Sequence, residues 1–247
     1  MTHFDYLIFT FGFVLEVLIL WRGLRTRLWR HYPFFYVYLG YVFIRSLILF
    51  ALAHLQFSGY AITYWLSDAA AVLLWFFVTW EVFRQTFSSP LAVRRVVGQL
   101  LLILLVGLTV ALFFGSKSAG LFFADLERKA GFVQAALLMA TLLLARYYGL
   151  PLGRNTWGMA LGLGMYVSVA IVNFASLELV KSFFPYWRLI RPLSFIGMLG
   201  VWAWALWSYA PNPKSATVAL EVSERSLVHW SQAWSEVRAV LRKAVGL

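Results

Sequence analysis

The chain has 247 residues, of which 62% are hydrophobic and only 13% are charged, which excludes a sizeable water-facing domain. It contains no cysteine, which excludes a disulfide framework, a thiolate metal site and a thiol nucleophile. The net charge of +11 comes from 21 lysines and arginines against 10 acidic residues, and the positions of the basic residues decide what that charge means.

Seven stretches of mostly apolar residues are each long enough to cross a bilayer as an α-helix, at about 1.5 Å of rise per residue. They predict an all-α, polytopic membrane protein built as a seven-transmembrane-helix bundle. The predicted spans are residues 4–21, 33–53, 60–83, 96–114, 130–149, 156–178 and 188–209. We expect residues 1–210 to form one transmembrane domain and residues 211–247 to form a cytoplasmic tail.

The first span is predicted to stay in the mature chain. Asp5 stands where a signal peptide would have a basic leader, and no small-residue cleavage site follows the apolar run.

Lysine and arginine are unevenly divided between the two sides of the predicted bundle. Fourteen lie in the gaps after the first, third and fifth spans and in the tail, against six at most on the other side. Basic residues favour the cytoplasmic side, so this predicts N-outside/C-inside in the bacterial inner (plasma) membrane. The same residues would meet the anionic inner leaflet of the lipid bilayer, so the net charge does not imply nucleic acid, which we exclude as a partner.

Few ionisable residues lie inside the predicted spans, and each is costly in hydrocarbon, so each is a candidate for function. Arg45 lies about 18 Å above the inner end of the second span, and Asp68 about 22 Å above the inner end of the third, at about 1.5 Å per residue. At nearly equal depth on antiparallel neighbours, they are expected to pair. Glu16 lies lower in the first span, where the long arginine side chain could reach toward it.

Three interpretations of this pair stay open. The pair can fix helix packing alone, a proton relay can run through Asp68 or Glu16, or the pair can line an outward-opening cavity for a small polar or anionic ligand. In the last case the candidate ligand-binding residues all lie in the outer halves of their helices. They are Arg45, Asp68, Gln134, Asn173 and Arg191.

Two further charged residues are predicted to lie near the membrane surface. Pro192 is expected in the first turn of the seventh helix, which places Arg191 at the headgroup level instead of in a cavity. Glu81 lies at the inner end of the third span beside Arg84, and we expect a surface ion pair there.

Small residues form a strip along the sixth span, of the kind that lets transmembrane backbones approach closely. Packing inside the bundle is expected, with homodimerisation as the alternative. The strip consists of Gly158, Gly162, Gly164 and Ser168.

A weak internal repeat relates the first three spans to the last three. It predicts two parallel three-helix units joined by the fourth span, as in one class of small transporters. The matching residues are Tyr64-Trp65 with Tyr186-Trp187, Trp80 with Trp202, Arg22 with Arg146, and Arg30 with Arg154.

The tail is predicted to contain an amphipathic helix. Its apolar residues recur at spacings of three and four, and basic residues fall on the other faces. The stripe consists of Leu227, Trp230, Trp234, Val237, Leu241 and Ala244. We expect the helix to lie on the inner leaflet or to bind a membrane or cytoplasmic protein partner.

Catalytic and cofactor signatures are missing from the sequence. It has no HExxH, GxSxG or Walker A motif. The four histidines lie at ends, in loops or in the tail, and the last span has no lysine, which argues against haem, a metal cluster and retinal. We therefore expect no enzyme activity, no cofactor and no metal.

Three segments carry a broad resemblance. They are Arg30-His31-Tyr32-Pro33-Phe34-Phe35, Trp80-Glu81-Val82-Phe83-Arg84 and Arg146-Tyr147-Tyr148-Gly149-Leu150. With them the chain resembles small bacterial seven-helix membrane proteins and, more loosely, the seven-helix input modules of bacterial sensor kinases. The latter resemblance implies sensing, with the signal passed to a separate protein because the sequence shows no output domain.

Three functions from different classes follow as hypotheses. The first is a ligand-sensing module with an outward-facing polar cavity that signals to a separate partner. The second is a small-solute transporter of the 3+1+3 helix type. The third is an accessory subunit of a larger membrane protein complex.

Overall fold

A computed structural model describes residues 3–87, 91–114, 122–179 and 184–213. Within these ranges the chain forms seven long helices, one for each predicted span, and a single 3-10 turn. The elements are α1 (His3–Arg25), η1 (Leu28–Arg30), α2 (Pro33–His54), α3 (Tyr60–Thr86), α4 (Leu91–Phe114), α5 (Phe122–Tyr147), α6 (Arg154–Leu179) and α7 (Phe184–Ala205). The predicted tail helix lies outside the described residues.

The described helices have the length and surface of membrane spans. Five of them, α1, α2, α3, α5 and α6, are long and apolar enough to cross a membrane, while α4 and α7 carry shorter apolar stretches. Large apolar side chains face outward: Leu7, Ile62 and Val172 are 68%, 67% and 64% exposed. Such a surface is stable in hydrocarbon and not in water. The described part of the chain therefore has the helices and the surface of a helical membrane protein.

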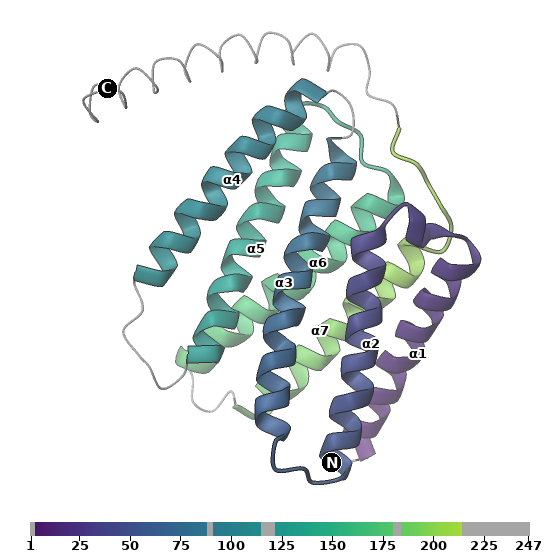
Figure 1. Cartoon of the computed structure of the whole chain (residues 1–247), viewed down its shortest axis with the longest axis vertical. Coiled ribbons are helices and arrows are strands. Elements are labelled where there is room, and N and C mark those ends of the chain that lie inside the picture. The colour runs from purple at the N-terminus through teal and green to yellow at the C-terminus, as the bar shows by residue number, and fades with distance from the viewer. Residues whose placement is uncertain (1–2, 88–90, 115–121, 180–183, 214–247) are drawn as a thin grey trace.

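Six of the described helices close a ring. In order of contact it runs α1, α2, α3, α5, α6, α7 and back to α1, with α3 also touching α6. The remaining helix, α4, packs on α5 at the edge of the bundle (Figure 1). Helices α1–α3 and α5–α7 are packed in the same order, and the first helix of each unit contacts the third helix of the other. A two-fold relation between the units, as the internal repeat predicts, requires this pattern.

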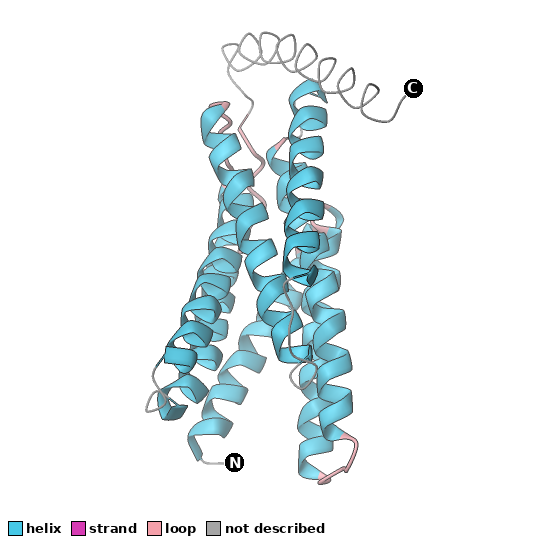
Figure 2. Cartoon of the chain, turned by 90° about the vertical axis from the view of Figure 1, so that its left-hand side faces the viewer, coloured by secondary structure: helices cyan, strands magenta, loops and turns pink. Residues whose placement is uncertain are grey.

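Basic residues gather at one end of the bundle. The α1–α2 and α5–α6 connections and the last turns of α3 and α7 lie there, opposite the α2–α3 connection (Figures 1 and 2). We call this the arginine end, defined by Arg22, Arg25, Arg27, Arg30, Arg84, Arg146 and Arg154.

Hydrogen bonds tie the segments of the arginine end together. Arg22 Nε donates to the Trp207 carbonyl at 2.7 Å. Asn212 Oδ1 accepts from the Gly153 N–H at 2.8 Å, and Asn212 Nδ2 donates to the Gln85 carbonyl at 2.7 Å. The segment after α7 is therefore fixed to α1, to the start of α6 and to the end of α3.

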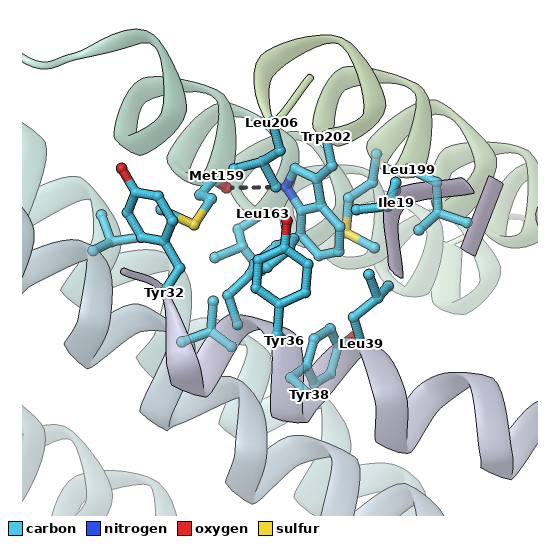
Figure 3. Packing of buried hydrophobic residues seen from close by; sticks show 14 of the residues in the cluster. Ile19, Tyr32, Tyr36, Tyr38, Leu39, Met159, Leu163, Leu199, Trp202 and Leu206 are labelled. Atoms are coloured by element: carbon cyan, nitrogen blue, oxygen red, sulfur yellow. Dashed lines mark hydrogen bonds between the residues drawn. The ribbon is translucent and has the colours of Figure 1, made fainter. Parts of the chain in front are cut away.

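The largest apolar cluster surrounds Trp202 of α7, which is fully buried (Figure 3). Its ring packs edge-to-face on Phe35 of α2 with 4.8 Å between centroids, and its Nε1–H donates to the Met159 carbonyl of α6 at 3.4 Å. This one side chain thus joins three helices.

The small-residue strip of α6 lies inside the bundle. A Cβ on Gly158 would lie 2.0 Å from the Cβ of Ala205, and one on Gly162 would lie 2.4 Å from Trp202 Nε1. Gly164 faces Leu138 of α5 at 3.5 Å. Packing within the bundle is confirmed for these glycines, and Gly158 and Gly162 leave no room for a larger side chain against α7. Ser168 differs, because it is exposed.

The seventh helix starts earlier than the sequence predicted. Helix α7 begins at Phe184, so Pro192 lies well inside the helix and the expectation of a first-turn proline there is wrong. Pro185 occupies the first turn instead, where its missing N–H costs nothing. The longer helix carries Arg191 past the surface level and onto the wall of a cavity within the bundle.

The prediction of a surface ion pair for Glu81 is also wrong. The residue is fully buried, and its carboxylate accepts the N–H groups of Phe35 at 2.8 Å and Phe34 at 3.4 Å. These N–H groups belong to the first turn of α2, which has no partner for them within the helix. Because α3 runs antiparallel to α2, the end of α3 lies beside the start of α2. Glu81 therefore caps the N-terminus of α2.

Replacing Glu81 with alanine should lower the unfolding free energy by about 2 kcal/mol, because the N–H groups of Phe34 and Phe35 lose their acceptor. Glu81→Gln should lose less, since the amide oxygen still accepts one hydrogen bond. The measurement is unfolding by SDS titration in mixed micelles, with Arg84→Ala as the control. A loss in Arg84→Ala as large as that in Glu81→Ala would restore the ion-pair interpretation.

Candidate binding cavity

A partly open cavity of about 470 Å³ lies between α2, α3, α5, α6 and α7. Arg45, Asp68, Gln134 and Arg191 all line it. At about 1.5 Å per residue, Arg45, Asp68 and Arg191 lie roughly 10 to 14 Å from the helix ends opposite the arginine end, and Gln134 about midway along α5. The cavity therefore lies in the half of the bundle away from the arginine end.

The Arg45–Asp68 ion pair is present on the cavity wall. Arg45 Nη2 lies 2.7 Å from Asp68 Oδ1, with the two side chains 17% and 10% exposed. Arg45 Nε also donates to Ser67 Oγ at 3.0 Å, and the guanidinium lies over the ring of Tyr64, 5.2 Å from its centroid. A planar guanidinium suits this combination of carboxylate, hydroxyl and aromatic face.

The register of α2 against α3 places the pair. The two helices form an antiparallel hairpin joined by a short connection. Tyr41 OH donates to the Ser67 carbonyl at 2.7 Å, which fixes one helix against the other. Arg45 lies one turn after Tyr41 and Asp68 follows Ser67, so both side chains reach the same level on the cavity wall.

Two buried polar groups on the wall have no hydrogen-bond partner among the described residues. Gln134 is 3% exposed, and its Nε2 donates to the Val72 carbonyl at 3.2 Å, but its Oε1 is unsatisfied. The indole N–H of Trp75 is unsatisfied as well. Buried polar groups in membrane proteins are almost always paired, so an acceptor and a donor remain here for a ligand or water.

Aromatic side chains from α3, α6 and α7 form one part of the wall, which we call the aromatic wall. Trp75 of α3 packs edge-to-face on Tyr166 of α6 at 5.3 Å, and Tyr166 in turn packs on Phe195 of α7 at 6.0 Å. The Tyr166 hydroxyl lies 3.5 Å from Arg191 Nε. This surface offers contact to the apolar part of a ligand beside the charged groups.

The residues that line the cavity include more basic than acidic side chains. Among its lining residues, Arg45, Asp68 and Arg191 have formal charges, and Asp68 neutralises Arg45. Positive charge in a low-dielectric recess attracts anions and orients them. Chemically, the cavity can hold a small molecule with an anionic group and an apolar portion.

Compared with protein-family models, with curated proteins and with solved structures, the chain matches none.

The structure brings four of the five predicted ligand-binding residues together. Asn173 is the exception: it is buried on α6 but does not line the cavity. Glu16 also stands apart, because it lines a second cavity on the other side of Ser46 and makes no ion pair with Arg45.

Sequence reasoning missed the aromatic wall. A signal was available in the helical spacing of the charged residues. On α2, Tyr38 and Val42 precede Arg45 by seven and three positions, and on α3 Trp75 follows Asp68 by seven. Residues at such spacings share one helix face. Listing the residues three and seven positions from each charged residue would therefore have identified these cavity-lining side chains.

Proposed function

We propose that this protein is a seven-transmembrane-helix membrane protein that senses a small anionic or polar molecule in the cavity and signals to a separate partner. The Arg45–Asp68 ion pair on the wall of a partly open cavity carries the proposal. The unsatisfied groups of Gln134 and Trp75 support it, because a ligand would give them partners.

The proposed orientation is N-outside/C-inside in the inner membrane. It rests on the arginine end, which would face the cytoplasm and the anionic inner leaflet. The cavity then opens in the outer half of the bundle, accessible to a ligand from outside.

Helix α7 offers a route for the signal. Arg191 and Phe195 line the cavity, and Pro192 lies between them inside the helix, where a proline weakens the backbone hydrogen bonding and permits bending. At the other end, the segment after α7 is bonded to Arg22 and Gln85. A ligand that shifts α7 would therefore rearrange contacts at the arginine end, where a cytoplasmic partner would meet the protein.

The first test is native mass spectrometry of the protein extracted gently from its own host membrane. A small-molecule adduct that is lost in Arg191→Gln supports binding in the cavity. A spectrum with no adduct, or with the adduct unchanged in Arg191→Gln, contradicts the proposal.

Filling the cavity gives a sharper prediction that leaves every charge in place. Gly131 lines the cavity, and nothing lies within 4 Å of where its Cβ would be, so Gly131→Phe should extend into open space. We expect its adduct occupancy to fall about tenfold, the equivalent of about 1.4 kcal/mol.

The matched control is Gly40→Phe, whose Cβ also meets nothing within 4 Å but lies outside the cavity. It should keep wild-type occupancy. Equal occupancy in the two variants, with both folded, would place the ligand elsewhere.

A small-solute transporter is the second candidate, favoured by the matching contact order of the two three-helix units and by a cavity between them. Counterflow of the identified adduct in proteoliposomes separates transport from sensing. An accessory subunit would instead show a stoichiometric protein partner in the same spectra, unaffected by Asp68→Ala.

A further inference from the structure

A second cavity, of about 420 Å³, lies between α1, α2 and α7. It adjoins the first, since Ser46, Pro192 and Phe195 line both. Its chemistry is different, because Glu16 is the one ionisable residue among its lining residues and the wall is otherwise almost entirely apolar.

Glu16 has no counterion in the described part of the chain. The residue is 1% exposed, and its Oε2 has no hydrogen-bond partner. The ion pair found among the described residues uses Asp68, so Arg45 is already engaged by another carboxylate. A carboxylate inside a membrane bundle is costly unless something pairs with it.

The surroundings of Glu16 suit a cation with an apolar body. Phe9 and Phe13 of α1 and Phe195 of α7 line the same cavity. Aromatic faces attract organic cations through the ring quadrupole and also cover their apolar parts. An inorganic cation would find one carboxylate and few other oxygen ligands, too few for a stable coordination shell.

We propose that the cavity around Glu16 is a second binding site, which takes an organic monocation with a protonated amine and an aromatic or aliphatic body. The ammonium group donates a hydrogen bond to the Glu16 carboxylate, and the body packs against the phenylalanines. This site is independent of the proposed sensing function, because its charge and most of its wall are its own.

Phenethylammonium is the probe, and its neutral counterpart 2-phenylethanol is the reference. Binding to the full chain in detergent micelles is measured by equilibrium dialysis. We expect saturable binding of phenethylammonium, about tenfold tighter than that of the alcohol, because a charge-assisted hydrogen bond is added. In Glu16→Gln, which keeps the size of the side chain, this preference for the cation should disappear.

A steric variant tests the site without touching Glu16. Gly12 lines the cavity, and its Cβ would meet Ile196 at 3.9 Å, an ordinary contact, so Gly12→Leu should occupy the cavity. It should abolish phenethylammonium binding, while Gly40→Leu should bind as wild type. If Glu16→Gln fails to fold, Gly12→Leu carries the test alone.

Two results would overturn the proposal. One is an absence of saturable phenethylammonium binding to the wild type, and the other is undiminished binding in folded Glu16→Gln or Gly12→Leu. Gly131→Phe, which fills the first cavity, should leave phenethylammonium binding unchanged. Loss of the native adduct in that variant alone therefore reports on the proposed function and not on this site.

Discussion

Replacing Gly158 with alanine should lower the unfolding free energy by about 3 kcal/mol, although it adds a single methyl group. The new Cβ would lie 2.0 Å from the Cβ of Ala205, whereas ordinary carbon contacts are about 3.5 to 4 Å. Helices α6 and α7 would have to separate to relieve the clash. Separation would also loosen Trp202 of α7, whose indole contacts α6 and α2.

An exchange of the two side chains tests this cause directly. The Gly158 Cβ would lie 3.5 Å from the Cα of Ala205, so the double variant Gly158→Ala/Ala205→Gly has room for its methyl group. We expect it to recover most of the lost stability in SDS titrations. Gly40→Ala, whose Cβ meets nothing within 4 Å, should be neutral or slightly stabilising. A destabilised double variant would show that backbone conformation matters at Gly158 and close packing does not.

The sequence predicted the helices well because membrane insertion is governed by properties that a sequence displays directly. Each of the seven described helices overlaps its predicted span, and the interior glycines of α6 were correctly expected to pack within the bundle. Apolar length and small-residue spacing are local signals. The pairing of Arg45 with Asp68 could also be predicted, since depth along two consecutive antiparallel helices follows from counting residues.

The wrong predictions concern contacts between segments whose relative positions cannot be obtained by counting residues along the helices. Glu81 caps α2 because of the axial register of α3, and its sequence neighbours point only to nearby arginines. Pro192 was a plausible helix start, but Pro185 offers the same first-turn signal seven residues earlier. Asn173 shares a helix face with the cavity residues Tyr166 and Ala170, but it lies about one turn closer to the end of α6 and does not line the cavity.

Removing one member of the Arg45–Asp68 pair is the second change with a large expected effect. Asp68→Leu should cost about 3 kcal/mol, because Arg45 would keep a mostly buried charge without its carboxylate partner. Arg45→Met should cost a similar amount, since Asp68 is 7% exposed. Each single variant is measured by SDS titration in mixed micelles.

The double variant Arg45→Met/Asp68→Leu separates the roles of the pair. Apolar residues of similar volume often replace a buried ion pair without loss, so we expect its stability to return to within about 1 kcal/mol of wild type. Its native adduct should nevertheless be lost, because the ligand would no longer meet the guanidinium of Arg45. If the double variant folds and keeps the adduct, the pair is a packing device and the ligand is held by Arg191 and the aromatic wall. If it stays as unstable as the single variants, Arg45 contributes its hydrogen bond to Ser67 and its cation–π contact with Tyr64, which the apolar replacements do not supply.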